Sequence, residues 1–244
     1  MKIKRRYLKF LRFLLLLILL ILMVLGIYWI MQPRVKNNVI KIQTPMLNKP
    51  VVDMTKYENE LSDWVKAWQK AIPEFNLSAM VKSREGPFKP NREEAYRPNA
   101  ENERLRKPIL VFSPDNSKYL DLNEGMGLSE ENGVLWAVFE VDTGVALVDL
   151  KNKKYIELLF SGPSGGGNDE AFWLDNHTFA IAGAEMQQKK ETWVYVPTLA
   201  IYNLMNSRVV VYSGPGVSEE IYFNLIRKLI WKNFYRKHPN IRMR

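Results

Sequence analysis

Very few residues in this chain have the types and spacing that catalysis requires. The only glycine-rich stretch, residues 161–167 (SGPSGGG), lacks the Lys-Ser or Lys-Thr pair that completes a phosphate-binding loop. The two histidines, His177 and His238, lie far apart in the sequence and there is no cysteine, which disfavours a zinc site. We therefore predict no catalytic, cofactor-binding or metal-binding residues, and a flexible turn at 161–167.

Acidic side chains can still form a catalytic pair, because a carboxylate dyad needs spatial proximity rather than a motif. Asp169, Glu170 and Asp175 fall in expected loops and are the residues that a hydrolase hypothesis would use. Tryptophans suit a different function, since a large amphipathic ring can stack on a saccharide or a peptide. The residues expected to contact such a ligand are Trp136, Trp173 and Trp193, together with nearby tyrosines.

The stretch that positions everything else is residues 13–31 (FLLLLILLILMVLGIYWIM), which contain no charge and no proline. As a helix, this stretch spans about 28 Å, close to the thickness of the hydrocarbon core of a bilayer. The segment before it, residues 1–12, has six basic and no acidic side chains, so we expect the N-terminus in the cytoplasm. A transmembrane helix over 13–31 is therefore predicted. The membrane-interface residues are expected to be Lys4, Arg5, Arg6, Tyr28 and Trp29.

A cleaved signal peptide has the same order of basic and apolar residues. Its apolar core is about 7 to 15 residues long and ends in a small-x-small cleavage site. Here the apolar run is longer, and no such pair of small residues follows Gly26. The pattern favours an uncleaved signal anchor in the plasma (inner) membrane, with the bulk of the chain extracytoplasmic.

The net charge of +9 comes from the two ends of the chain. Residues 1–12 carry six of the 35 basic residues, and residues 227–244 carry seven more without any acid. Between these ends, 22 basic residues face 26 acidic ones, so the middle of the chain is mildly acidic. Such a domain offers no basic surface for phosphates, and we expect no nucleic-acid partner.

Residues 32–107 are expected to form a stalk, an amphipathic helix and a charged linker. The stalk contains three prolines and a short candidate strand at 39–43. Thr55 and Glu58 have capping-box spacing, and apolar residues follow at helical intervals up to Pro73. We expect Trp64 and Trp68 in this helix to be core residues. In 82–107, 13 of the 26 residues are charged, so we predict a long loop or linker there.

From 108 to 217 the sequence changes to short apolar runs broken by turn residues, which is typical of β structure. Asp-Asn, Asp-Thr-Gly and Lys-Asn sequences mark the turns. The expected strands are 109–113, 118–122, 134–141, 145–150, 154–160, 171–174, 178–182, 192–196, 199–204 and 208–212.

Two parts of this β region match each other. ALVDLKNKKYIELLFSGP (146–163) corresponds to AIYNLMNSRVVVYSGP (200–215), and VFSPDNSKYLDL (111–122) corresponds to FWLDNHTFAIAG (172–183). The copies are offset by 52 to 61 residues, slightly more than the usual length of a four-stranded blade. We interpret them as two similar antiparallel β units.

These units resemble the β-propeller repeats of WD40-like and TolB-like proteins. The stretch FSPDNSKYLDL is similar to the strand–SPDG–strand turn of that family, with Asn116 in place of the glycine. The Trp-Asp pair of WD40 blades is missing, and Val148-Asp149 and Tyr202-Asn203 occupy the comparable places. Propellers close with about four to eight blades, whereas two are found here. Flanking helices, oligomerisation or an ordinary stack of two sheets would have to cover the remaining faces.

Residues 218–244 are expected to form a basic amphipathic helix. Ser218 is a suitable N-cap, with Glu219 and Glu220 in the first turn, and Pro239 ends the pattern. The apolar stripe can pack on the β region, and the basic residues can face anionic lipid headgroups.

The fold class that follows is mainly β with flanking α: an N-terminal transmembrane helix, two propeller-blade-like antiparallel β units, and one helix on either side of them. Propeller repeats mostly present binding surfaces, so the leading hypothesis is a non-enzymatic interaction or scaffolding domain. Its expected partners are the lipid bilayer and either another protein or a second copy of the chain. A membrane-tethered sensor of a saccharide or peptide is the alternative, and a hydrolase ranks lowest.

Overall fold

The computed structural model of this chain describes residues 54, 57–139, 143–161, 166–189 and 192–244. The chain divides into two units, Met1–Asn37 and Asn38–Arg244, and all described residues belong to the second. Among them, no helix is both long enough and apolar enough to cross a bilayer. The predicted transmembrane helix at 13–31, its five interface residues and the candidate strand at 39–43 lie outside the described residues, so these remain predictions.

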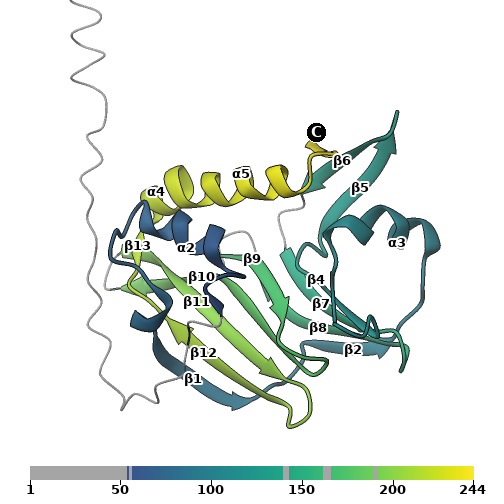
Figure 1. Cartoon of the computed structure of the whole chain (residues 1–244), viewed down its shortest axis with the longest axis horizontal. Helices are drawn as coiled ribbons and strands as arrows, with labels where there is room; N and C mark the ends of the chain where they lie inside the picture. The colour runs from purple at the N-terminus through teal and green to yellow at the C-terminus, as the bar shows by residue number, and fades with distance from the viewer. Residues whose placement is uncertain (1–53, 55–56, 140–142, 162–165, 190–191) are drawn as a thin grey trace, which may run out of the picture. The chain divides into compact units, whose positions relative to one another are not determined.

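The expectation of a mainly β chain with few helices is confirmed for the described part (Figure 1). A six-stranded antiparallel sheet contains, in spatial order, β1 (Val81–Pro87), β12 (Arg208–Ser213), β11 (Thr192–Asn203), β10 (Thr178–Lys189) and β9 (Gly166–Trp173), with the short β13 (Val217–Ser218) paired to β11. A five-stranded antiparallel sheet contains β2 (Arg92–Ala95), β8 (Lys154–Ser161), β7 (Thr143–Asp149), β4 (Lys118–Asp121) and β3 (Val111–Phe112). A small third sheet contains β14 (Ile241–Met243), β6 (Val134–Phe139) and β5 (Met126–Glu131).

The two repeated stretches form equivalent hairpins. In β7–β8, Asp149 pairs with Lys154 across the residues 150–153, and in β11–β12, Asn203 pairs with Arg208 across 204–207. The last loop residue has φ 51° in both hairpins, and the Asp149 or Asn203 side chain accepts backbone N–H groups of the loop. A polar residue directly before the loop, Asp in one hairpin and Asn in the other, thus stabilises the same kind of turn in both. Propeller-type closure stays a prediction.

The two large sheets pack against each other through one apolar layer. Alternate residues of β4 and β7, including Leu120 and Leu147, meet alternate residues of β10 and β11, including Phe179 and Tyr202. The rings of Phe179 and Tyr202 stack with centroids 4.9 Å apart. Because side chains alternate across a strand, this layer fixes which residues of the five-stranded sheet face away from it.

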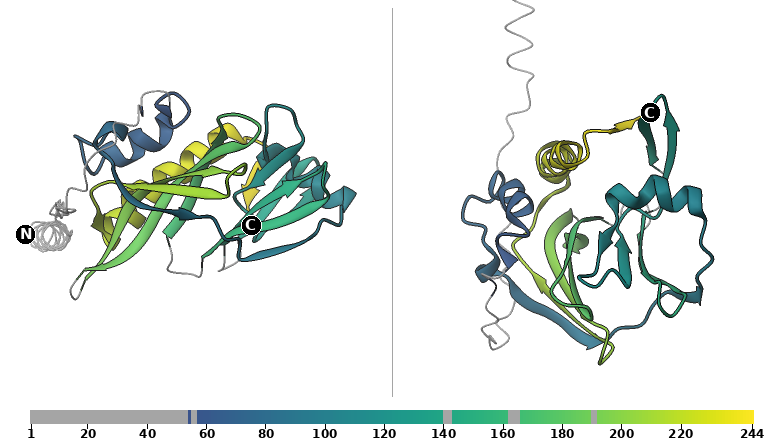
Figure 2. Two further views of the ribbon diagram at one scale, coloured as in Figure 1. Left: turned by 90° about the horizontal axis from the view of Figure 1, so that it is seen from below. Right: turned by 45° about the vertical axis from the view of Figure 1, so that its right-hand side comes forward.

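Helices cover the other face of the six-stranded sheet (Figures 1 and 2). The helix α2 (Ser62–Gln69) places Trp64 and Trp68 in the core with no exposed surface, as predicted. The helix begins later than expected, at Ser62, and its N-cap residue is Leu61 instead of the predicted Thr55. A short 3₁₀ turn, η2 (Leu77–Ala79), then leads to β1.

The predicted C-terminal helix is present but interrupted. It consists of α4 (Glu219–Ile221), a π-helical turn η4 (Tyr222–Ile226) and α5 (Arg227–Lys237), with Ser218 as the N-cap. Ile221, Tyr222 and Ile226 are buried in the same core as α2, so the first half of the helix packs on the β region. The end of the chain then forms β14, which pairs in parallel with β6 and was not expected.

The predicted loop or linker at 82–107 is wrong. This segment forms β1, β2 and the helix α3 (Ala100–Arg106), followed by the 3₁₀ turn η3 (Lys107–Ile109). A charged strand needs no apolar face of its own when its backbone completes a sheet edge, and β1 pairs with β12 while β2 pairs with β8. The side chain of Asn99 caps α3 by accepting the backbone N–H of Asn102.

Other strand boundaries also differ from expectation. The expected strands at 192–196 and 199–204 form one strand, β11 (Thr192–Asn203), which runs through Pro197. Two segments outside the expected strands also form strands: β5 contains the acidic pair Glu130-Glu131, and β9 contains Asp169 and Glu170. Part of the glycine-rich stretch, residues 162–165, lies outside the described residues.

Candidate functional site

A large cavity of about 510 Å³ lies on the outward face of the five-stranded sheet. Its floor is built by the strand residues that alternate with the apolar layer: Tyr119 and Asp121 of β4, Ala146 and Val148 of β7, and Tyr155 of β8. The sheet therefore uses one face for the core and the other for a polar cavity.

The wall of the cavity comes from the segment that was expected to be a linker. Residues 94–99 lead from β2 to α3, and α3 contributes Asn102, Glu103 and Arg106. Figure 2 shows this chain arching away from β2 and returning through α3 beside the five-stranded sheet. Glu124, in the connection between β4 and β5, completes the lining on the far side of Asp121.

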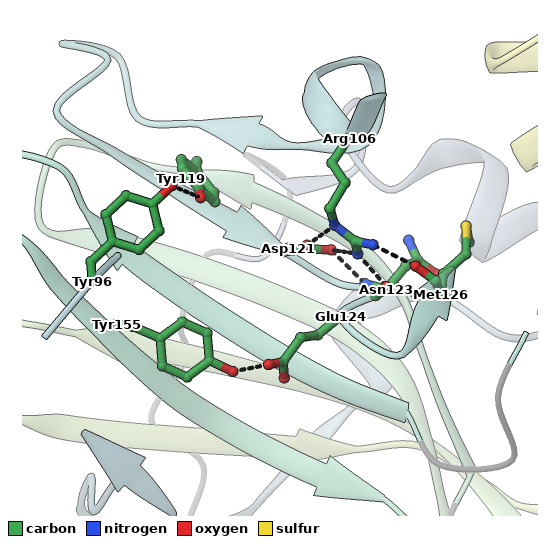
Figure 3. A network of polar contacts seen from close by, with 8 residues as sticks. All are labelled: Tyr96, Arg106, Tyr119, Asp121, Asn123, Glu124, Met126 and Tyr155. Carbon is green, nitrogen blue, oxygen red and sulfur yellow. Dashed lines mark hydrogen bonds and ion pairs between the residues drawn. The ribbon is translucent and has the colours of Figure 1, made fainter. Parts of the chain in front are cut away.

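A buried ion pair holds α3 in place. The Arg106 guanidinium donates from Nε and Nη2 to the two carboxylate oxygens of Asp121, at 2.6 and 2.8 Å, and both side chains are 8% exposed. The same guanidinium donates to the backbone oxygens of Asn123 and Met126 (Figure 3). The Arg106 guanidinium thus donates to acceptors within the protein, and its pair with Asp121 positions α3 beside the cavity.

Three tyrosine hydroxyls line this cavity, and two of them donate to carboxylates; Figure 3 shows the Tyr96–Tyr119 and Tyr155–Glu124 contacts. The Tyr96 hydroxyl donates to Glu103 and lies 3.1 Å from the Tyr119 hydroxyl, and the Tyr155 hydroxyl donates to Glu124. Burial raises the pKa of Tyr96 and of Tyr119, so both phenols are neutral at physiological pH.

Glu124 is a partly buried carboxylate of the cavity. Burial raises its pKa, and the negative charges of Glu157 and Asp121 raise it further. Arg92 lowers it from 3.9 Å away, but Arg92 also pairs with Glu157 at 3.5 Å. Gly144 leaves space for the Glu124 side chain, because a Cβ atom at position 144 would lie 2.5 Å from Oε2 of Glu124.

The three tryptophans predicted to contact a ligand do not converge. Trp136 is on β6, with the Arg244 guanidinium 5.9 Å from the centre of its ring. Trp173, on β9, donates its ring N–H to the backbone oxygen of Val111 and packs against the layer between the sheets. Trp193 is 45% exposed at the start of β11. None of the three lines the cavity of about 510 Å³.

The carboxylates of the hydrolase hypothesis also lie outside the large cavity. Asp175 accepts the backbone N–H groups of His177 and Thr178 within its turn. Glu170 pairs with Lys237 at 3.0 Å. Asp169 accepts the Trp64 ring N–H at 3.2 Å beside Arg227, where a small cavity of about 40 Å³ opens. The described residues contain no cluster of ligands that could hold a metal ion.

Sequence reasoning missed the residues of the large cavity. The available signal was the alternation within the strands, where Tyr119 and Asp121 flank Leu120, and Tyr155 flanks the apolar Ile156. Comparisons with protein-family models, with curated proteins and with solved structures found no match for this chain.

We expect Asp121→Asn to lower the free energy of unfolding by about 3 to 5 kcal/mol, because it leaves the Arg106 guanidinium buried without its counter-charge. Urea denaturation of the full-length chain at pH 7 measures this. The double variant Arg106→Met/Asp121→Leu should recover much of the loss. Glu130→Gln removes an exposed pair with Arg104 and should cost about 1 kcal/mol or less. Equal effects of Asp121→Asn and Glu130→Gln would contradict the role given to the buried pair.

A second prediction concerns the pH dependence of stability. Burial raises the pKa of Asp169 to about 6, against the opposing effects of Arg227 and the Trp64 N–H. The folded state then binds a proton more tightly than the unfolded state, so this group favours folding below its unfolded pKa and loses that contribution as pH rises through 6.

Relative to Asp169→Asn, the wild-type chain should therefore gain about 2 kcal/mol of stability between pH 7.5 and pH 4.5. Urea denaturation at the two pH values gives this difference. Asp175→Asn is the control, because backbone N–H groups lower the pKa of Asp175 and its contribution should have the opposite sign. The same pH slope for wild type and Asp169→Asn would show that Asp169 does not titrate in this way.

Proposed function

We propose that this protein is a membrane-anchored binding protein. Residues 13–31 anchor it in the plasma (inner) membrane with the N-terminus in the cytoplasm, and the β domain on the other side binds a small polar ligand. The observation that carries the binding function is the convergence of Tyr96, Tyr119 and Tyr155 with two carboxylates on one cavity of about 510 Å³. Cavities of about 300 to 1,000 Å³ are typical of small-molecule sites.

The construction of the cavity supports this function. Its floor side chains stand on hydrogen-bonded strands whose opposite face is core, so their directions are fixed by packing. The wall is fixed by the buried pair of Arg106 and Asp121. Polar groups that are held in place before the ligand arrives lose little entropy on binding, which favours specific recognition.

Binding is supported more strongly than hydrolysis. Asp169, Glu170 and Asp175 each have a protein partner and lie outside the cavity, so they give no support to the hydrolase hypothesis. The sensor alternative keeps its expected tyrosine contacts, but the other contacts are now expected from carboxylates instead of Trp136, Trp173 and Trp193.

Full-length protein in detergent micelles should show a saturable thermal shift with at least one compound from a panel of saccharides, amino acids, short peptides and amines. Ala146→Phe should abolish the shift by filling the floor of the cavity. Tyr119→Phe and Tyr155→Phe should each weaken binding by about 2- to 10-fold, the effect of losing one hydroxyl hydrogen bond. Trp193→Ala is the control and should bind normally. A ligand that binds Ala146→Phe as tightly as wild type would exclude this cavity as its site.

The anchor has its own test. The full-length chain should stay with the membrane pellet after an alkaline wash, and a tag after Arg244 should be digested by protease added outside intact spheroplasts. Replacing Leu16, Leu19 and Leu20 by Asp should release the chain from the pellet, because charges at the centre of a spanning helix are costly. A wild-type chain in the aqueous fraction would refute the anchor.

The interaction or scaffolding function is the second candidate. It is favoured by two exposed aromatic side chains, Phe223 at 39% and Trp193 at 45%. Both lie near the buried Tyr195: the Phe223 ring is 5.2 Å from that of Tyr195, and Trp193 precedes Tyr195 by two residues on β11. Exposed aromatic side chains are frequent in protein interfaces. If this surface binds a protein, Trp193→Ala/Phe223→Ala should lose a partner that wild type retains on purification from native membranes.

A further inference from the structure

We infer that the ligand of the large cavity is an organic cation that carries a protonated amine. This inference rests on the proposed function, since it assumes that the cavity binds a small molecule. It is drawn from the charges, the free acceptors and the aromatic rings of the lining.

The charges of the lining do not balance. Asp121 and Arg106 neutralise each other as a buried pair. The remaining charged residues of the lining are the carboxylates of Glu94, Glu103 and Glu124 and the single guanidinium of Arg97. Glu94 and Arg97 are exposed, whereas Glu103 and Glu124 are partly buried. Outside the lining, the Arg92 guanidinium lies 3.9 Å from Glu124, but it also pairs with Glu157 at 3.5 Å. Arg92 thus serves two carboxylates, and Glu103 has no guanidinium in the lining to balance it. The interior keeps a negative charge, which favours a cation and repels an anion.

Both interior carboxylates keep an acceptor for a ligand. Glu103 and Glu124 each accept a tyrosine hydroxyl through Oε1. Their Oε2 atoms receive no hydrogen bond from the described residues. An ammonium group has three donors and no acceptor, so it matches a site that offers carboxylate oxygens. Tyr96 and Tyr155 use their hydroxyl protons on these carboxylates, and their oxygens accept from the Tyr119 hydroxyl at 3.1 Å and from the Arg92 guanidinium at 3.4 Å. The Oε2 atoms of Glu103 and Glu124 are therefore the acceptors left for a ligand.

The aromatic rings add a second attraction for a cation. Tyr96, Tyr119 and Tyr155 all line the cavity. At its edge the Arg92 guanidinium lies 5.2 Å from the centre of the Tyr155 ring, a cation–π distance. One face of that ring is thus already used by a cation. An alkylammonium stem can pack on the apolar Val148 and Ala146 of the floor while its charged end reaches a carboxylate.

Three four-carbon probes of equal length test the inference by isothermal titration calorimetry on the full-length protein in detergent micelles: 1,4-diaminobutane, 1,4-butanediol and succinate. The diamine should bind saturably and at least tenfold more tightly than the diol, and succinate should not bind. Glu103→Gln and Glu124→Gln should each weaken diamine binding about tenfold, and the double variant should lose it. Glu130→Gln, an acidic residue outside the cavity, is the matched control and should leave binding unchanged.

The outcomes separate this inference from the proposed function. A diamine that binds no more tightly than the diol, or that binds the double variant normally, overturns the cationic ligand. If a saccharide or the diol then binds wild type but not Ala146→Phe, the cavity is a binding site for neutral ligands and the proposed function survives. If neither these probes nor the wider panel gives saturable binding, both conclusions fall. Thermal melting of each variant confirms that it is folded.

Discussion

The apolar layer between the two large sheets is the constraint on which the rest of this domain depends. It is formed mainly by alternate residues of β4, β7, β8, β10 and β11, and a shift of one residue in any of these strands would expose the layer to water. With the register fixed, the opposite faces of both sheets are fixed too. The outer face of the six-stranded sheet is apolar and is covered by α2 and the C-terminal helix. The outer face of the five-stranded sheet is polar and forms the floor of the cavity.

The two faces are covered by different kinds of interaction. On the six-stranded sheet, Trp64, Trp68 and Tyr222 are excluded from solvent, and the Tyr222 ring stacks on Tyr195 with centroids 4.2 Å apart. On the five-stranded sheet, α3 is held by the Arg106–Asp121 pair instead of a broad apolar contact. A helix that is held by one ion pair can leave space between itself and the sheet, whereas a helix that packs through a broad apolar face fills that space. The cavity is a consequence of this difference.

The strands and helices with strong local patterns were accessible from the sequence. Alternation and turn residues located most strands of 108–217, and the similarity of two stretches correctly paired the hairpins around 150–153 and 204–207. The spacing of Trp64 and Trp68 correctly indicated a buried helix face. These features are local, because a turn, a cap or an amphipathic face is specified by residues within a few positions of each other. The charge balance of the folded middle is also a property of composition alone.

Tertiary structure alone determined the secondary structure of residues 82–107 and the position of the site. Their charged sequence has no amphipathic pattern, and β1 and β2 exist because β12 and β8, far along the chain, offer free backbone edges. The partner of Arg106 could not be read from its neighbours in sequence, since Asp121 belongs to another element. The cavity residues come from β4, β7, β8, α3 and their connections, and only folding makes them neighbours. Local patterns specify elements, whereas a site made by side chains from several elements depends on how those elements pack.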